Sequence, residues 1–391
     1  MYAVKDLYDF YRIRWLDLLG YHPGRSARIP LSLRYTKSDA VAESVQALIR
    51  KIRDVGASPA PISMNAQEYI ESQLQALKDT ELANSVPRNE EEMADAIFAI
   101  LMSKKFRKYS VPKENQEIIR AAIGKNVAND ESIKISWPFG GYKLWRLEEA
   151  PKVDWAELFS IMYFIRWLKP VCALYPKGVE FTFWVDEVVI AQMNNIPQKD
   201  IDAYQDSFSG LLKFIQLWQP LNLKFEVFLE RSQYESNEAF QEGLAKEMNK
   251  LSQVRAANPE PLSDSAVRSI EMNVRPVPEY AHDPLWREKV DLMHSAYYNL
   301  QEQQTRIRPA YTRANITAFS VFFEPNVIPI GTTKTSIAKF WVGVGALKKR
   351  DGSFIETVLS PEQINSSNST REHVHLDGLE GKNFSTIRIL S

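Results

Sequence analysis

Cysteine is almost absent from this chain. Its 391 residues include one cysteine, Cys172, which excludes an intramolecular disulfide and a cysteine-based metal cluster. Such a composition fits a reducing compartment. Because Cys172 lies in the apolar stretch LKPVCALYP, we expect a small buried side chain and not a nucleophile.

Net charge and long apolar segments are lacking as well. Lysine and arginine total 48 against 49 acidic residues, a net charge of −1, so any site for a polyanion must be local. The longest apolar run, about 158–168, is interrupted by Ser160 and Arg166 and is shorter than the ~20 residues of a membrane span. The acidic N-terminal stretch is unlike a secretory signal. We therefore expect a cytoplasmic protein without membrane association.

The common catalytic signatures are missing too. The chain contains no GxxxxGK[ST], no GxGxxG after a strand, no HExxH and no GxSxG, so it lacks the signatures of P-loop, dinucleotide-binding, zinc-protease and serine-hydrolase sites. His373 and His375 alternate as on a strand and with Asp377 could hold a metal. A lone HxH pattern is more often a polar strand face, and we expect no metal.

Helical patterns dominate the first third of the chain. Apolar residues recur at helical spacing over 4–19, 39–52, 66–77 and 90–106, with Gly- and Pro-containing stretches between them. At 45% apolar and 11% aromatic residues, the chain can bury a large core. We predict a helical N-terminal region over 1–128.

Strands and helices then alternate. A β-prone run, SIKISWPFGGYKLW, precedes a helix that starts at Asp154, with Glu157 completing a capping box, and stops near Pro170. The strand GVEFTFWVDEVVI, the helix DIDAYQDSFSGLLKFIQLW and the strand LNLKFEVFLE follow. This order predicts a Rossmann-like α/β domain over 129–391 with a mixed, mainly parallel sheet.

The last part of the chain is more varied. We predict partial helix over 231–270 with ANPEPLSDS as a loop, a helix over about 284–306, and strands in ITAFSVFFEP, AKFWVGVGAL and FSTIRIL. The last of these ties the C-terminus into a sheet. The segment INSSNSTREH reads as a short polar loop.

Paired carboxylates follow one predicted strand. Asp186 and Glu187 end FTFWVDEVVI, and open parallel sheets bind ligands beyond the carboxyl ends of their strands. Neighbouring strand residues point to opposite faces, so at most one carboxylate faces a ligand. Two solvated acids at a turn are an equally good interpretation.

Cationic and amide side chains supply further candidates. The loop PFGGYKLWR offers Lys143 and Arg146 for a phosphate or carboxylate, and Asn195 in NNIP could orient a substrate. A local concentration of cations in RIRPAYTRAN and GTTKTSIAKF indicates an anion site for a sugar phosphate, a carboxylate or the acceptor end of an RNA. Solvated loops explain the same residues. The cations are Arg306, Arg308, Arg313 and Lys334.

The central third of the chain, about 136–230, resembles the isocyanide (isonitrile) synthase family of natural-product biosynthesis. The resemblance is carried by the order of PFGGYK, the helix start VDWAELFSI, the unit YPKGVEFTFWVDEVVI, and the helix IPQKDIDAYQDSFSGLL. Two departures indicate a divergent member: Gly140 stands where the family usually has Lys, and Val185-Asp186-Glu187 stands for its Ser-Asp-Gly turn.

The resemblance implies a Rossmann-like enzyme that condenses the amino group of an amino acid with ribulose 5-phosphate, without metal or nucleotide cofactor. By matching position it implies that a carboxylate shuttles protons and that Lys143 or an arginine of the basic cluster holds phosphate. The residues expected to be catalytic are Lys143, Glu157, Asp186 and Glu187. Those expected to bind substrate are Arg146, Asn195, Tyr204, Arg306, Arg308, Arg313 and Lys334.

Two other functions remain open from the sequence. A tRNA-dependent cyclodipeptide synthase or related aminoacyl transferase, with aminoacyl-tRNA as partner, would use the same arginines. A non-catalytic interaction protein built on the helical region is the third interpretation.

Overall fold

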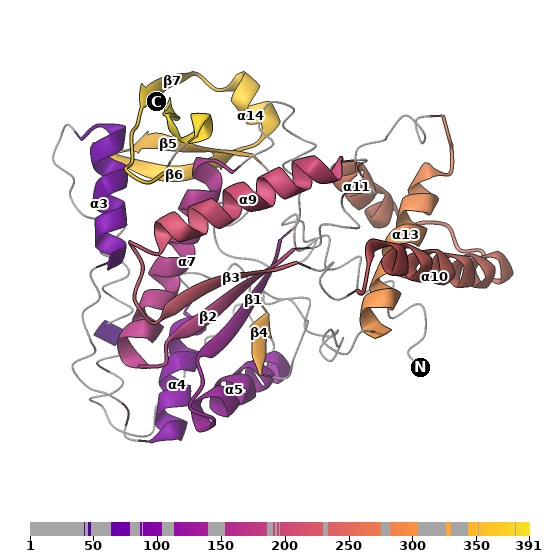
Figure 1. The fold of residues 1–391 in the computed structure, drawn as a ribbon, viewed down its shortest axis with the longest axis horizontal. Helices are drawn as coiled ribbons and strands as arrows, with labels where there is room; N and C mark the ends of the chain where they lie inside the picture. Colours follow the sequence, from indigo (N-terminus) through magenta and orange to yellow (C-terminus); the bar gives the residue numbers. More distant parts are fainter. Residues whose placement is uncertain are drawn as a thin grey trace.

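The computed structural model describes most of the chain, and the α/β class is confirmed within that part (Figure 1). Helices and strands alternate through the middle of the molecule, and the strands form two four-stranded sheets. Apart from a few isolated positions, the described residues are 64–78, 89–103, 113–139, 153–185, 196–229, 234–274, 282–303, 326–329, 343–350, 352–379 and 381–391.

The N-terminal region is helical where it is described. The helices are α3 (Ala66–Lys78), α4 (Glu90–Leu101) and α5 (Lys113–Ala128), in agreement with the helices predicted from 66 and from 90. The predicted helix over 4–19 lies outside the described residues. Lys169 of helix α7 (Trp155–Leu174) donates to the carbonyl of Ala76, with 2.6 Å between nitrogen and oxygen. Helix α3 therefore packs directly on the α/β part, and the domain boundary at 128 stays a prediction.

Sheet A contains β1 (Ile133–Phe139), β2 (Val179–Val185), β3 (Leu223–Leu229) and β4 (Val327–Pro329). Its order is β3-β2-β1-β4, and every pair is parallel. Helix α7 (Trp155–Leu174) connects β1 to β2, and α9 (Gln198–Ile215) connects β2 to β3. The predicted alternation of strands and helices is confirmed.

Aromatic rings fill the space between sheet A and these two helices. Phe164 of α7 lies 5.0 Å from Trp137 and 4.8 Å from Phe181, ring centroid to centroid. Phe183 meets Phe208 of α9 edge to face at 5.1 Å. Such pairs stabilise a core beyond the area they bury. The spacing of Ile201, Tyr204, Phe208, Leu211, Ile215 and Trp218 predicts one apolar helical face. The first five are buried on α9, whereas Trp218 lies beyond the end of the helix and is partly buried.

The prediction that the helix from Asp154 stops near Pro170 is wrong. Helix α7 continues through Pro170 to Leu174. A proline inside a helix forgoes one backbone hydrogen bond, but Leu168, Pro170 and Val171 are all buried. Tertiary packing therefore outweighs the local cost. Cys172 is 3% exposed, as expected, and burial raises the pKa of its thiol to about 12.

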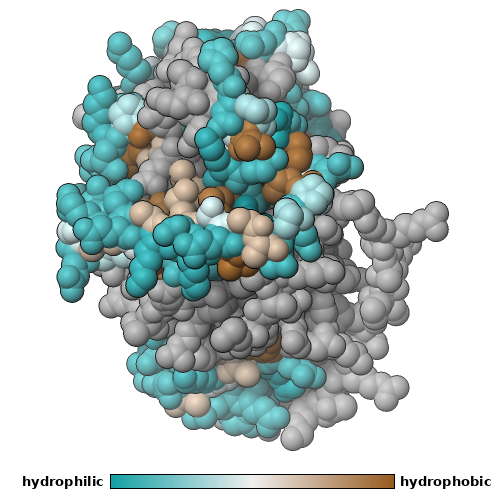
Figure 2. Space-filling view, turned by 90° about the vertical axis from the view of Figure 1, so that its right-hand side faces the viewer, coloured by the Kyte–Doolittle hydropathy of each residue, from teal (hydrophilic) through white to brown (hydrophobic). Residues whose placement is uncertain are grey.

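A group of helices follows β3. It consists of α10 (Asn237–Ala257), α11 (Asp264–Asn273) and α13 (Trp286–Gln303), which confirms partial helix over 231–270 and a helix within 284–306. Arg255 of α10 pairs with Asp291 of α13 at 2.7 Å between nitrogen and oxygen. The described residues on this face of the molecule are mainly hydrophilic, with apolar ones among them (Figure 2).

Sheet B contains β5 (Val344–Arg350), β6 (Ser353–Leu359), β7 (Ser369–His373) and β8 (Thr386–Leu390). Its order is β6-β5-β8-β7, with β5 and β8 parallel and the other pairs antiparallel. The C-terminus is thus tied into a sheet, as predicted. We predicted a single sheet with mixed pairing. The structure instead has an all-parallel sheet A and a mixed sheet B.

One predicted loop in this region is wrong. The segment INSSNSTREH contains the end of helix α14 (Pro361–Ser366) and all of β7. Its side chains are polar because much of β7 is exposed, so no apolar alternation marks the strand. The predicted strand in ITAFSVFFEP lies outside the described residues. Among the helices that the structure describes, none is long and apolar enough to cross a membrane.

Candidate functional site

The first turn of α7 begins the candidate site. Asp154 caps the helix: its Oδ1 accepts from the backbone N–H of Ala156 at 2.7 Å. Glu157 reaches back, and its Oε2 accepts from the N–H of Asp154 at 2.7 Å. The predicted capping box is confirmed, and it holds the Glu157 side chain in one orientation.

Glu157 and Tyr204 meet inside the protein. The Tyr204 hydroxyl donates to Oε1 of Glu157 at 2.8 Å, and these side chains belong to different helices, 47 positions apart. Glu157 is 0% exposed and Tyr204 is 3% exposed. Two predicted site residues from different segments of the sequence are therefore in direct contact, and both carboxylate oxygens of Glu157 have donors.

The contact fixes the protonation of the phenol. Burial, and next the charge of Glu157, hold the pKa of Tyr204 well above its ordinary value. The phenol therefore keeps its proton at neutral pH and serves as a hydrogen-bond donor. In this arrangement Tyr204 orients Glu157.

Sheet B contacts the same helical turn through two hydrogen bonds. The backbone N–H of Gly345 on β5 donates to Oδ1 of Asp154 at 3.2 Å, and Trp155 Nε1 donates to the carbonyl of Thr386 on β8 at 2.8 Å. A Cβ at position 345 would lie 2.4 Å from the nitrogen of Ala156. The close approach thus requires glycine. The sequence patterns did not predict that Asp154 and Gly345 join helix α7 to sheet B. A glycine inside a strand is nevertheless a signal of close backbone approach.

Two of the predicted site residues come shortly after strands of sheet A in the sequence. Phe139, Val185 and Leu229 end the first three strands in register. The loop with Lys143 follows β1, and Asp186 follows β2 directly. Nine predicted site residues lie outside the described residues: Lys143, Arg146, Asp186, Glu187, Asn195, Arg306, Arg308, Arg313 and Lys334.

The YPKG part of the family-like unit has a structural role at the opposite edge. Gly178 has φ +66°, and a Cβ there would lie 1.7 Å from the carbonyl oxygen of Asn222. The Tyr175 hydroxyl donates to the carbonyl of Glu131 at 2.8 Å, and the Asn222 amide donates to that of Cys172 at 2.9 Å. These contacts bring the amino ends of β1, β2 and β3 together.

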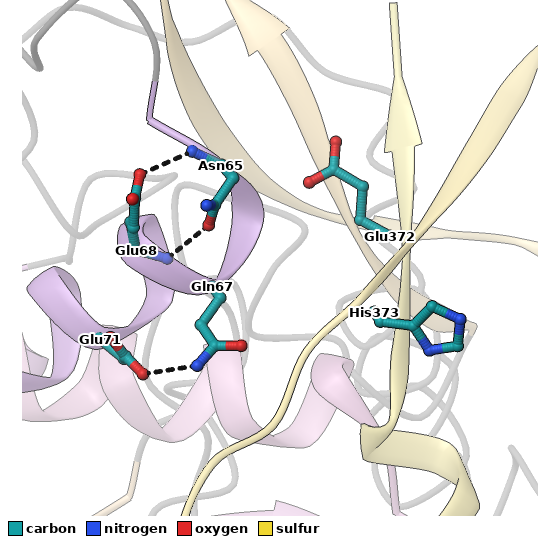
Figure 3. A pocket seen from close by; sticks show the side chains of 6 residues that line it. All are labelled: Asn65, Gln67, Glu68, Glu71, Glu372 and His373. Atoms are coloured by element: carbon teal, nitrogen blue, oxygen red, sulfur yellow. Dashed lines mark hydrogen bonds between the residues drawn. The ribbon is translucent and has the colours of Figure 1, made fainter.

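A polar hollow of about 460 Å³ lies between α3 and β7, lined by Asn65, Gln67, Glu68, Glu71, Glu372 and His373 (Figure 3). The polar groups that line it form hydrogen bonds with the first turn of α3. The backbone N–H of Asn65 donates to the Glu68 carboxylate, and the N–H of Glu68 donates to the Asn65 side chain. Glu372 accepts from the N–H of Ala66 at 3.0 Å. The hollow therefore belongs to the capping of α3.

The histidines near the C-terminus lie on the surface. His375 Nε2 is 3.2 Å from Oδ1 of Asp377, and both side chains are exposed. In the described part of the chain, no group of three or more His, Cys, Asp or Glu side chains has a metal-binding arrangement.

Comparisons with known proteins give a similarity at the level of structure. No protein-family model and no curated protein matches the sequence. Among solved structures, the protein is similar to the PvcA protein from Pseudomonas aeruginosa, with 12% sequence identity and a TM-score of 0.43. The similarity covers 76% of this chain and 99% of PvcA.

Proposed function

We propose that this protein is an enzyme of the isocyanide synthase type, which condenses the amino group of an amino acid with a sugar phosphate such as ribulose 5-phosphate. The proposal starts from the sequence resemblance over 136–230, where four family-like segments occur in the family's order. The parallel strands and crossover helices of sheet A agree with the Rossmann-like fold that the resemblance implies.

The hydrogen bond between Tyr204 and Glu157 is the main observation that supports the proposal. The resemblance selects Glu157 from the AEL helix and Tyr204 from the IDAY helix, and their side chains are 2.8 Å apart. A fortuitous match of two segments does not require their selected side chains to meet. Their contact therefore supports reading both segments as parts of one site.

The geometry of sheet A supports the remaining candidates. Strands β1 and β2 are neighbours and end in register at Phe139 and Val185. The segments with Lys143 and Asp186 thus leave the sheet at adjacent points of its carboxyl edge, where parallel sheets bind ligands.

The enclosed position of Glu157 separates the proposed roles. Because Glu157 is fully buried and holds two hydrogen bonds, we assign it and Tyr204 to positioning. Proton transfer during imine formation and breakdown is assigned to Asp186, with Glu187 as its neighbour at the turn. Lys143 and the arginines of 306–313 are assigned to the phosphate.

Thermal shift with the twenty amino acids, each with and without ribulose 5-phosphate, tests the binding step. A ligand that binds only the folded protein adds about 2.7 kcal/mol to the free energy of unfolding at a hundredfold excess over Kd, and this raises the melting temperature. We expect one amino acid to raise the melting temperature, and the sugar phosphate to raise it further. No response to any combination contradicts the proposal.

Product formation tests the reaction. Incubation with the amino acid found above and ribulose 5-phosphate should give a product with the mass and infrared band of an isonitrile. Asp186→Asn should abolish the product, whereas Asp206→Asn, at an exposed carboxylate of α9, should not. Binding of aminoacyl-tRNA without turnover of the free amino acid would indicate the aminoacyl-transferase class instead.

A further inference from the structure

The outer face of sheet B carries two arginines side by side. Arg371 of β7 pairs with Arg388 of β8, which in turn pairs with Ala346 of β5. Cross-strand partners share one face of a sheet. In the next row on this face, Lys348 of β5 lies opposite Leu390 and Ile355.

The opposite face of sheet B is turned toward the protein. Glu356 forms an ion pair with Arg166 of α7 at 2.6 Å, and Phe354 contacts Tyr69 of α3 with ring centroids 5.5 Å apart. On β7, Glu372 points toward α3 and His373 points away from it (Figure 3). Arg371 shares the side of His373 because strand residues alternate. Arg371 and Arg388 therefore face outward.

Neither of these two arginines has a carboxylate partner among the residues that the structure describes. The only side chain bonded to Arg388 there is Ser369, whose Oγ accepts from Nη1 at 3.3 Å. Other arginines of the same part of the chain form ion pairs: Arg120 with Asp95, Arg166 with Glu356, Arg255 with Asp291, and Arg287 with Glu271.

Placing two like charges directly opposite each other destabilises a sheet. Partial burial, and next the charge of Arg371, lower the pKa of the Arg388 guanidinium. A bound anion would remove this repulsion. Two guanidinium groups side by side present planar sets of N–H donors, which match the oxygens of a phosphate.

We propose that the outer face of sheet B binds a small phosphate monoester between Arg371 and Arg388, with Lys348 beside it. A small ligand fits better than a nucleic acid, because strands that bind single-stranded nucleic acid offer aromatic rings for stacking. The residues on this side of the three rows are Arg371, Arg388, Ala346, Thr357, Ser369, Leu390, Lys348, Ile355, His373 and Thr386, without phenylalanine, tyrosine or tryptophan. Ala346 is the fully buried member of this set. This site is separate from the proposed reaction and does not depend on it.

Arginine-selective ¹⁵N NMR of the full chain tests the site. The Nε resonances of the two arginines are assigned with Arg371→Gln and Arg388→Gln, and that of ion-paired Arg120 with Arg120→Gln. The probes are inorganic phosphate and glycerol 3-phosphate, each compared with sodium chloride at equal ionic strength. Reading individual arginines keeps this site distinct from any phosphate bound elsewhere in the protein.

We expect the Arg371 and Arg388 resonances to shift and saturate with glycerol 3-phosphate, while that of Arg120 stays in place. Either glutamine variant should weaken binding, measured at the remaining arginine, by roughly tenfold or more. The melting temperature of each variant without phosphate should equal or exceed that of the wild type. Absent shifts, or shifts shared by Arg120, would overturn the proposal. So would saturation by a short single-stranded RNA, titrated in parallel, if glycerol 3-phosphate gives none.

Discussion

The carboxylate of Glu157 is held by two donors from different helical segments: the backbone N–H of Asp154 and the Tyr204 hydroxyl. In a buried setting each such hydrogen bond matters because a lone donor or acceptor finds no water. Residue-scale effects at this junction should therefore be large, and they should not be additive.

Tyr204→Phe tests this contact. Removing the hydroxyl leaves Oε1 of Glu157 without its donor in a buried site, so we expect a loss of about 1–3 kcal/mol in the free energy of unfolding. Urea denaturation measures it. Glu157→Gln alone and together with Tyr204→Phe completes a double-mutant cycle, in which we expect a coupling energy of about 0.5–3 kcal/mol. Strictly additive losses would contradict a direct bond between the two side chains.

Gly345→Ala tests the approach of sheet B to α7. A new Cβ would lie 2.4 Å from the nitrogen of Ala156, and because backbone must move to accommodate it, we expect a loss of about 1–3 kcal/mol or more. Gly210→Ala is the matched control: nothing lies within 4 Å of its Cβ position, and alanine in a helix interior gains up to about 1 kcal/mol. Equal effects of the two substitutions on the melting temperature would contradict this packing.

At the scale of elements, helix α7 joins the layers of the molecule. In Figure 1 it lies between sheet A and sheet B. Arg166 extends from it to Glu356 of β6, and its Nη1 and Nη2 each donate to a carboxylate oxygen at 2.6 Å. Nη2 also donates to Gln73 of α3 at 3.1 Å. Three elements thus depend on one guanidinium.

Arg166→Met should cost about 3–5 kcal/mol in the free energy of unfolding, because the nearly buried carboxylate of Glu356 loses its counter-charge. Combining it with Glu356→Leu should recover most of that loss, since two apolar side chains replace the pair. Guanidinium denaturation of the wild type, both single variants and the double variant measures the effect. A double variant no more stable than Arg166→Met would show that the cost lies elsewhere.

Sequence patterns predicted the elements whose burial is one-sided or whose ends carry specific caps. The inner face of α9 follows from its apolar spacing, and the start of α7 follows from Asp154 and Glu157. The polar strand β7 left no alternation to read, and the continuation of α7 past Pro170 depends on packing from other parts of the chain. Local sequence signals therefore predicted whether a segment is a helix or a strand better than they predicted the residue at which it ends.

The candidate site was predictable in part for the same reason. Glu157 and Tyr204 stand in recognisable helical contexts, so both were selected. The role of Asp154 and Gly345 in joining sheet B to α7 requires two segments 191 positions apart. No local pattern encodes that meeting.

At the scale of the whole molecule, two sheets share one helix, and the first turn of that helix contacts both α9 and sheet B. A change in sheet B would therefore reach the Glu157–Tyr204 pair through a single turn. In the proposed enzyme, sheet B would support the site without contributing to the chemistry.

In the proposed enzyme, an amino acid and a sugar phosphate would bind at the carboxyl edge of sheet A. A crystal structure of the protein soaked with ribulose 5-phosphate and the amino acid that raises its melting temperature tests this directly. We expect density for both at that edge, lined by Lys143, Asp186 and Arg308. Finding these three side chains on separate surfaces, with neither ligand between them, would contradict the claim.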